Sequence, residues 1–168
     1  MRIDFQGIKE CAFLNGRLFN IWNYSEFGWG YYTKNAELAE SFGFKKEDCF
    51  EESKTYFLPI KDIAHTRGFY SYVGCKYKGY KCFVHSYGKN EKKFCVAIPE
   101  DLALTMGIDG YRWGHETPSM DVPLSDLDEI YRHREKLDDF IFDVDPIKPI
   151  YKDGKWLIEP DENGVYVI

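Results

Sequence analysis

A β-hairpin between Phe69 and Tyr87 is the feature that most restricts how this chain can fold. Lys78-Gly79 is the turn candidate between two runs of β-prone residues, and a two-residue turn pairs the residues on either side of it. Because side chains alternate between the two faces of a strand, the turn fixes the register of the whole hairpin. The predicted cross-strand partners are Tyr77 with Tyr80, Lys76 with Lys81, Cys75 with Cys82, Val73 with Val84, Tyr72 with His85, Ser71 with Ser86, and Tyr70 with Tyr87.

The remaining patterns predict an α+β fold: a mainly antiparallel sheet of meander and hairpin strands with two or three helices packed on it. Asn15-Gly16 marks a second hairpin, and residues 94–98 continue the meander as a third strand. We expect short helices near residues 35–42 and 99–107, because a capping residue opens each and a glycine follows each. The longest predicted helix covers 125–140, where Ser125 starts an apolar stripe with helical spacing.

The chain is expected to form a single globular domain over residues 1–168. Its 44% hydrophobic residues supply enough material for one core, and no linker or repeat divides it. The sequence opens without an apolar signal segment, and its apolar runs are too short to cross a membrane. The five cysteines are an odd number without a CxxC spacing, which is typical of reduced thiols. We therefore expect a cytoplasmic protein with no membrane partner.

Charge is unevenly distributed along the chain. Lysines outnumber acids from residue 69 to 93, and acids outnumber basic residues from 118 to 145. The formal net charge is −6, which argues against non-specific binding of nucleic acid by the domain as a whole, because a phosphate backbone attracts positive charge. An acidic protein is instead suited to meeting a basic protein partner.

One face of the predicted hairpin combines aromatic and basic side chains. Two lysines directly opposite each other are unfavourable unless an anionic group lies between them. That group is either an acid of the 125–140 helix, which we favour, or a phosphate whose bases stack on the tyrosines. The residues of this possible anion-binding face are Tyr70, Tyr72, Lys76, Lys81, His85 and Tyr87. It is the basis of an alternative function, a nucleic-acid or nucleotide binder.

The sequence contains no recognised catalytic or metal-binding signature. Histidines with metal-ligand spacing, nucleophile motifs and glycine-rich phosphate loops are all missing, so we expect neither a metal nor a cofactor. A loop histidine beside a glutamate can perform acid–base chemistry, and His115 with Glu116 has that arrangement. A small hydrolase built from His115, Glu116 and His65 is therefore a further alternative, although we lean against an enzyme.

The function that these features favour is a non-catalytic protein-binding domain. Acidic charge, small size and aromatic wealth, with 13 Tyr, 13 Phe and 4 Trp, are similar in kind to the profile of bacterial immunity proteins. The resemblance implies an inhibitor that neutralises a basic toxin or nuclease domain. The acids expected to contact the partner are Asp126, Glu129, Asp138 and Asp139. The expected aromatic anchors are Trp29 and Trp113, which lie in glycine-flanked segments.

Overall fold

The computed structural model describes all residues except 6–8, 47–53, 109–117 and 161–168. The chain divides into two compact units, and both are assembled from separate stretches of sequence. Unit 1 comprises Met1–Ile8, Ser71–Arg134 and Asp145–Ile168, and unit 2 comprises Lys9–Tyr70 and Glu135–Val144. Two strands contribute residues to both units, so the expectation of one domain over 1–168 stays a prediction.

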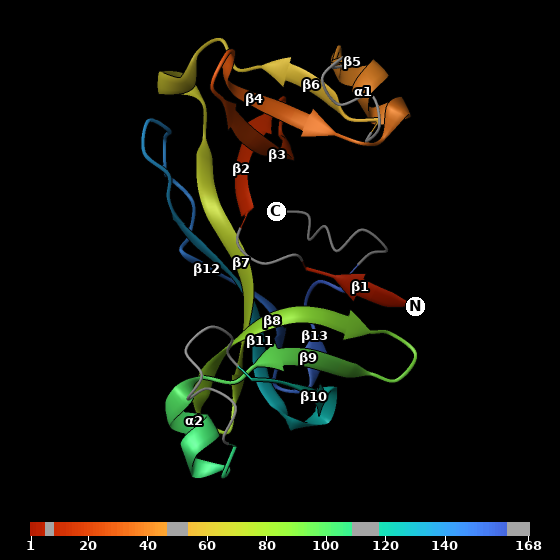
Figure 1. The fold of residues 1–168 in the computed structure, drawn as a ribbon, viewed down its shortest axis with the longest axis vertical. Coiled ribbons are helices and arrows are strands. Elements are labelled where there is room, and N and C mark those ends of the chain that lie inside the picture. The colour runs from red at the N-terminus through yellow and green to blue at the C-terminus, as the bar shows by residue number, and fades with distance from the viewer. Residues whose placement is uncertain (6–8, 47–53, 109–117, 161–168) are drawn as a thin grey trace. The chain divides into compact units, whose positions relative to one another are not determined.

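The predicted α+β class is wrong, because strands dominate the described chain and its α-helices are two short segments (Figure 1). The protein is β-rich, and its sheet is mostly antiparallel. The helices are α1 (Ala36–Phe42) and α2 (Glu100–Thr105), close to two of the predicted positions. The third and longest predicted helix does not exist.

Unit 2 is a run of neighbouring strands in the order β7-β2-β3-β4-β6-β5. Their bounds are β2 (Lys9–Leu14), β3 (Arg17–Tyr24), β4 (Gly28–Thr33), β5 (Lys45–Lys46), β6 (Tyr56–Pro59) and β7 (Gly68–Tyr77). The predicted Asn15-Gly16 turn is confirmed, since both residues have the positive φ angles, 48° and 79°, of a type I′ turn. Helix α1 begins as expected at Asn35, whose side chain accepts a hydrogen bond from the Leu38 amide.

The core of unit 2 lies on one face of these strands. It brings together residues from both stretches of chain, because Leu137 and Phe140 are buried among residues that precede position 70. The Phe140 ring packs edge-to-face on Trp29, with ring centroids 5.2 Å apart. The buried members of this core are Ala12, Phe19, Ile21, Tyr31, Ala39, Phe44, Leu137 and Phe140.

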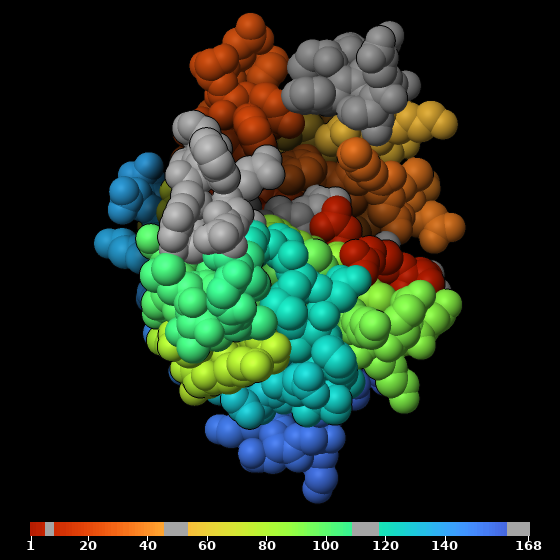
Figure 2. Space-filling model, turned by 60° about the horizontal axis from the view of Figure 1, so that its bottom comes forward, coloured from red at the N-terminus to blue at the C-terminus, as the bar shows by residue number. Residues whose placement is uncertain are grey.

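Unit 1 contains most of β7 together with the remaining strands. They are β1 (Arg2–Asp4), β8 (Tyr80–Gly88), β9 (Lys93–Ala97), β10 (Ser119–Pro123), β11 (Leu127–Lys136), β12 (Ile147–Lys152) and β13 (Lys155–Trp156). Strands β10, β9, β8 and β7 are neighbours in that order, β1 also pairs with β8, and β11 pairs with both β7 and β12. Helix α2 lies beside β10 on the surface of this unit (Figure 2). Leu102 and Ala103 of α2 are buried in a second core with Val96 and Val122.

The hairpin register is confirmed near the turn and differs farther from it. Cys75 pairs with Cys82, Lys76 with Lys81 and Tyr77 with Tyr80, as predicted. From the turn, β7 pairs with β8 as far as Gly74 and Phe83. Beyond that point, at Ser86–Gly88, β8 pairs with β1. Tyr87 therefore faces Ile3 instead of Tyr70. A register shift between Val84 and Ser86 also breaks the alternation of β8, so the face that we expected to be continuous is not.

The segment predicted as the 125–140 helix is a short 3₁₀ turn at Leu124–Asp126 followed by the strand β11. Its apolar residues have helical spacing, but pairing with β7 and β12 determines the structure. The register shift in its pairing with β12 comes from Ile150, an extra residue on β12, and β11 itself advances one residue at a time. The buried residues of β11 are Leu127, Ile130, Tyr131 and Arg134, which have the spacing of one face of a helix.

Candidate functional site

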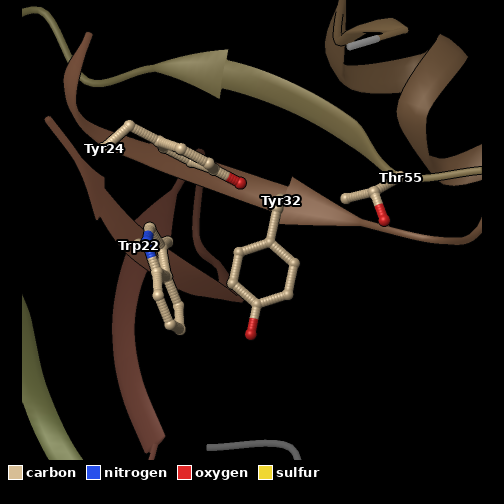
Figure 3. A pocket seen from close by; sticks show the side chains of 4 residues that line it. All are labelled: Trp22, Tyr24, Tyr32 and Thr55. Atoms are coloured by element: carbon tan, nitrogen blue, oxygen red, sulfur yellow. The ribbon is translucent and has the colours of Figure 1, made fainter. Parts of the chain in front are cut away.

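A pocket of about 480 Å³ opens on unit 2, on strands β3 and β4 and beside the start of β6. Trp22 and Tyr24 of β3, Tyr32 of β4 and Thr55 line it. Figure 3 shows the Trp22 and Tyr32 rings standing out from neighbouring strands in the same general direction, with the Tyr24 ring above them. Three of the four lining residues that the structure describes are therefore aromatic, and the volume is within the range of ligand-binding clefts.

Strand alternation explains why these side chains share one face. Trp22 is opposite Gly30 and Tyr24 is opposite Gly28, so β4 contributes no side chain at either position. Phe19 and Ile21 alternate with the pocket residues along β3 and point into the core of unit 2. The same strand thus supplies the core from one face and the pocket from the other.

Gly30 provides the space for the aromatic ring that packs behind the pocket. A Cβ atom at Gly30 would lie 2.0 Å from Cε2 of Phe57, so the ring occupies the space that any other residue would fill. Phe57 is only 4% exposed, and Tyr24 packs edge-to-face on it at 4.6 Å. Phe57 therefore fixes Tyr24, one wall of the pocket, through a ring contact.

Large apolar surface is exposed next to the pocket. Trp22 is 56% exposed and Phe27 is 53% exposed. The ring centroids of Phe27 and Phe57 lie 6.3 Å apart. Tyrosine and tryptophan are enriched at binding interfaces because each offers a wide apolar face with a polar group at its edge. Exposed aromatic surface around a pocket is typical of a binding site.

One acidic residue, Glu10, lies within electrostatic reach of the pocket residue Tyr32. Burial raises the pKa of the Tyr32 hydroxyl, and the neighbouring Cys11 and Glu10 raise it further through their charges. Burial also raises the pKa of Glu10 itself. Of these groups the Glu10 carboxylate carries a negative charge when ionised, and that charge favours a positive ligand near Tyr32 over a negative one.

The four acids predicted to contact a partner are divided between the units. Asp126 and Glu129 belong to unit 1, whereas Asp138 and Asp139 belong to unit 2. Asp126, Asp138 and Asp139 are exposed, and Glu129 is half-buried. A carboxylate oxygen of Glu129 lies 3.2 Å from Nζ of Lys76. An acid of this segment thus pairs with one of the two opposed lysines, and it comes from a strand and not from the helix that we expected.

Of the two predicted aromatic anchors, the structure describes only Trp29. Trp29 is half-buried, and its ring contacts Phe140 in the core of unit 2. Trp113 lies outside the described residues. The structure does not bring Trp29 into the pocket lining, where Trp22 is the exposed tryptophan.

The proposed anion-binding face is only partly assembled. Tyr72 stacks between His133 and Phe83, at centroid distances of 4.7 and 5.3 Å. Tyr87 is buried against Phe94, and Tyr70 packs on the core of unit 2. The members left exposed on β7 and β8 are Lys76, Lys81 and His85.

The alternative catalytic residues are not assembled by the described structure. His115 and Glu116 lie outside the described residues. His65 is exposed, and its Nδ1 lies 2.9 Å from a carboxylate oxygen of Asp62. Within the described part of the chain, no group of three or more His, Cys, Asp or Glu side chains is placed to hold a metal ion.

Sequence reasoning missed the pocket because it missed β4. The pattern of β3 places Trp22 on the face opposite Phe19 and Ile21, and that much was readable from the alternation. Gly28-Trp29-Gly30 resembles a break in structure, yet β4 begins at Gly28 and forms the other side of the pocket. The signal available was the aromatic density between residues 22 and 32.

Comparison with known proteins gives no match to any protein-family model, to any curated protein or to any solved structure. Among the helices of the described residues, none has the length and apolar character needed to span a membrane.

Proposed function

We propose that this protein is a non-catalytic binding protein whose aromatic pocket docks a partner protein. The observation that carries the proposal is the pocket walled by Trp22, Tyr24 and Tyr32, with Trp22 more than half exposed. A side chain of the partner that enters such a pocket would be desolvated by aromatic surface on several sides. Residues in this situation provide most of the binding energy of protein interfaces.

The charge of the chain supports a basic partner. The net charge is −6, and exposed acids occur in both units, including Asp126, Asp138 and Asp139. Such a surface speeds encounter with a positively charged protein and disfavours an acidic one. Our specific proposal is an immunity-type inhibitor that neutralises a basic toxin or nuclease domain in the cytoplasm.

The test is capture of a partner from a lysate of the source cells by wild type and by two variants. Trp22→Ala removes the exposed pocket wall. Leu104→Ala is the matched control, because Leu104 is also 56% exposed but lies on α2 in unit 1. We expect wild type and Leu104→Ala to retain one basic protein in roughly equal amount, and Trp22→Ala to lose it by at least about tenfold, since hot-spot truncations cost about 2 kcal/mol or more.

The capture is repeated at high salt, and the captured material is assayed for both protein and nucleic acid. Capture should weaken at high salt, because surface charges are screened. If both variants retain the protein equally, the pocket is not the docking site and the proposal fails. Recovery of nucleic acid in place of a protein would also overturn it and would favour the Tyr/Lys face. We do not advance that face as a second function, because both sides of the Tyr72 ring are stacked and Lys76 is paired with Glu129.

A further inference from the structure

We propose that the aromatic pocket binds a cationic side chain, the guanidinium group of an arginine on the basic partner. The inference rests on the proposed function, because it names the chemistry by which the partner is recognised. It is carried by three properties of the pocket: its aromatic walls, the hydroxyl groups among them, and the acidic residue beside it.

The aromatic walls attract a cation through their ring faces. Trp22, Tyr24 and Tyr32 surround the same space (Figure 3). The face of an aromatic ring is electron-rich, and tryptophan binds cations best among the natural side chains. Arginine is favoured over lysine because its planar guanidinium stacks on a ring and is more weakly hydrated.

The hydroxyl groups match a ligand that only donates hydrogen bonds. Tyr24, Tyr32 and Thr55 each carry a hydroxyl oxygen in the lining (Figure 3). A hydroxyl oxygen has two lone pairs, so it can accept a hydrogen bond while it donates one elsewhere. A guanidinium has five N–H donors and no acceptor, so these oxygens satisfy it and a carboxylate ligand would need their hydrogens instead.

The acidic residue beside the pocket, Glu10, favours a ligand of positive charge. Burial is the main cause of the raised pKa of Tyr32, and the Glu10 carboxylate adds to it, so this carboxylate lies within electrostatic reach of the Tyr32 hydroxyl. A guanidinium near Tyr32 would be stabilised by this charge, whereas an anion would be repelled. The net charge of −6 acts in the same direction over longer distances.

The size of the pocket also suits a complete arginine side chain. Its volume of about 480 Å³ exceeds what the guanidinium alone needs. The methylene stem of an arginine is apolar and packs on aromatic surface while its head group is held by polar atoms. Trp22 and Phe27 provide exposed aromatic surface for that stem.

The experiment compares two probes that differ in charge but not in shape. Nα-acetyl-arginine amide and its neutral isostere Nα-acetyl-citrulline amide are titrated with the full-length protein. The NMR signals of the probes are followed for every variant, and those of the Trp22 indole for each protein that retains it. We expect the arginine probe to shift these signals with an affinity about tenfold higher than the citrulline probe. Trp22→Ala should abolish binding, Glu10→Gln should weaken the arginine probe only, and Leu104→Ala should change neither.

Equal affinity for the two probes would overturn the inference. So would binding that leaves the NMR signals of the Trp22 indole unchanged. Two outcomes distinguish a failure of this inference from a failure of the proposed docking function. If the lysate experiment yields a Trp22-dependent protein but arginine is not preferred over citrulline, the docking function stands and the guanidinium assignment falls. If arginine is preferred and no partner protein depends on Trp22, the pocket binds cations and the docking function falls. Circular dichroism of each variant confirms that the fold is retained.

Discussion

Gly30 determines whether the aromatic wall behind the pocket can form. The atoms of the Phe57 ring lie where its Cβ would be, at 2.0 and 2.1 Å from the ideal position. Phe57 is buried, and a shift of its ring would disturb its packing on Tyr24 and Phe27. A single methyl group at position 30 should therefore displace the ring and deform the pocket.

We predict that Gly30→Ala lowers the free energy of unfolding by about 1–3 kcal/mol, the cost of overpacking a filled site. The measurement is urea unfolding followed by tryptophan fluorescence. Gly28→Ala is the control, because its Cβ would meet nothing within 4 Å, although its φ of 71° strains any side chain. Gly30→Ala should also weaken the arginine probe more than Gly28→Ala does. Equal behaviour of the two variants in both assays would show that Phe57 does not depend on the missing Cβ.

At the scale of elements, the β7–β8 hairpin carries an unfavourable charge arrangement. Lys76 lies opposite Lys81, and Glu129 contacts Lys76 from β11. The Lys76 side chain is 46% exposed, so water screens both the repulsion and the attraction. The ion pair with Glu129 nevertheless compensates only one of the two lysines.

We predict that Lys81→Glu stabilises the protein by about 0.5 kcal/mol, because a cross-strand pair of like charges becomes a pair of opposite charges. Thermal unfolding at low salt measures the change, and 1 M NaCl should remove most of it. Lys89→Glu is the control for altered net charge, since Lys89 is exposed just beyond the end of β8. An equal gain in both variants would assign the effect to net charge and contradict the role of the cross-strand pair.

How far the sequence predicts these elements depends on whether a turn fixes the register. Asn15-Gly16 and Lys78-Gly79 adopt positive φ angles that few residue pairs favour, so both hairpins could be located from sequence. Strand β11 could not, because its buried residues, Leu127, Ile130, Tyr131 and Arg134, have the spacing of a helix face and not the alternation of a strand. Its pairing with β7 and β12 links segments far apart in the chain, which local patterns do not record.

The candidate site was harder to predict than the hairpins for the same reason. A strand pattern assigns Trp22 to a face, but the pocket needs Tyr32 from β4 and Thr55 from beside β6. Those neighbours are set by sheet order, with β4 between β3 and β6. The acidic residues were identified by charge alone, and charge does not indicate which compact unit a residue joins.

At the scale of the whole molecule, each compact unit depends on chain from more than one part of the sequence. Unit 2 begins at Lys9 and runs to Tyr70, yet its core also contains Leu137 and Phe140. Phe140 contacts Trp29, and its ring occupies the space beside Gly68, where a Cβ would lie 2.7 Å from it. The segment 135–144 is therefore a structural part of unit 2, although it lies far from the rest in sequence.

We predict that residues 9–70 alone do not unfold cooperatively, because the fragment lacks two buried side chains, a leucine and a phenylalanine, whose loss costs about 2–5 kcal/mol each in a packed core. A unit of this size has only a few kcal/mol of stability to lose. Joining 135–144 to its end through a flexible Gly/Ser linker should restore a cooperative transition and the native fluorescence of Trp29. In the full chain, Phe140→Ala should destabilise by about 3–5 kcal/mol. A cooperative transition in the 9–70 fragment without the added segment would show that Leu137 and Phe140 are dispensable, and the pocket could then be studied on that fragment alone.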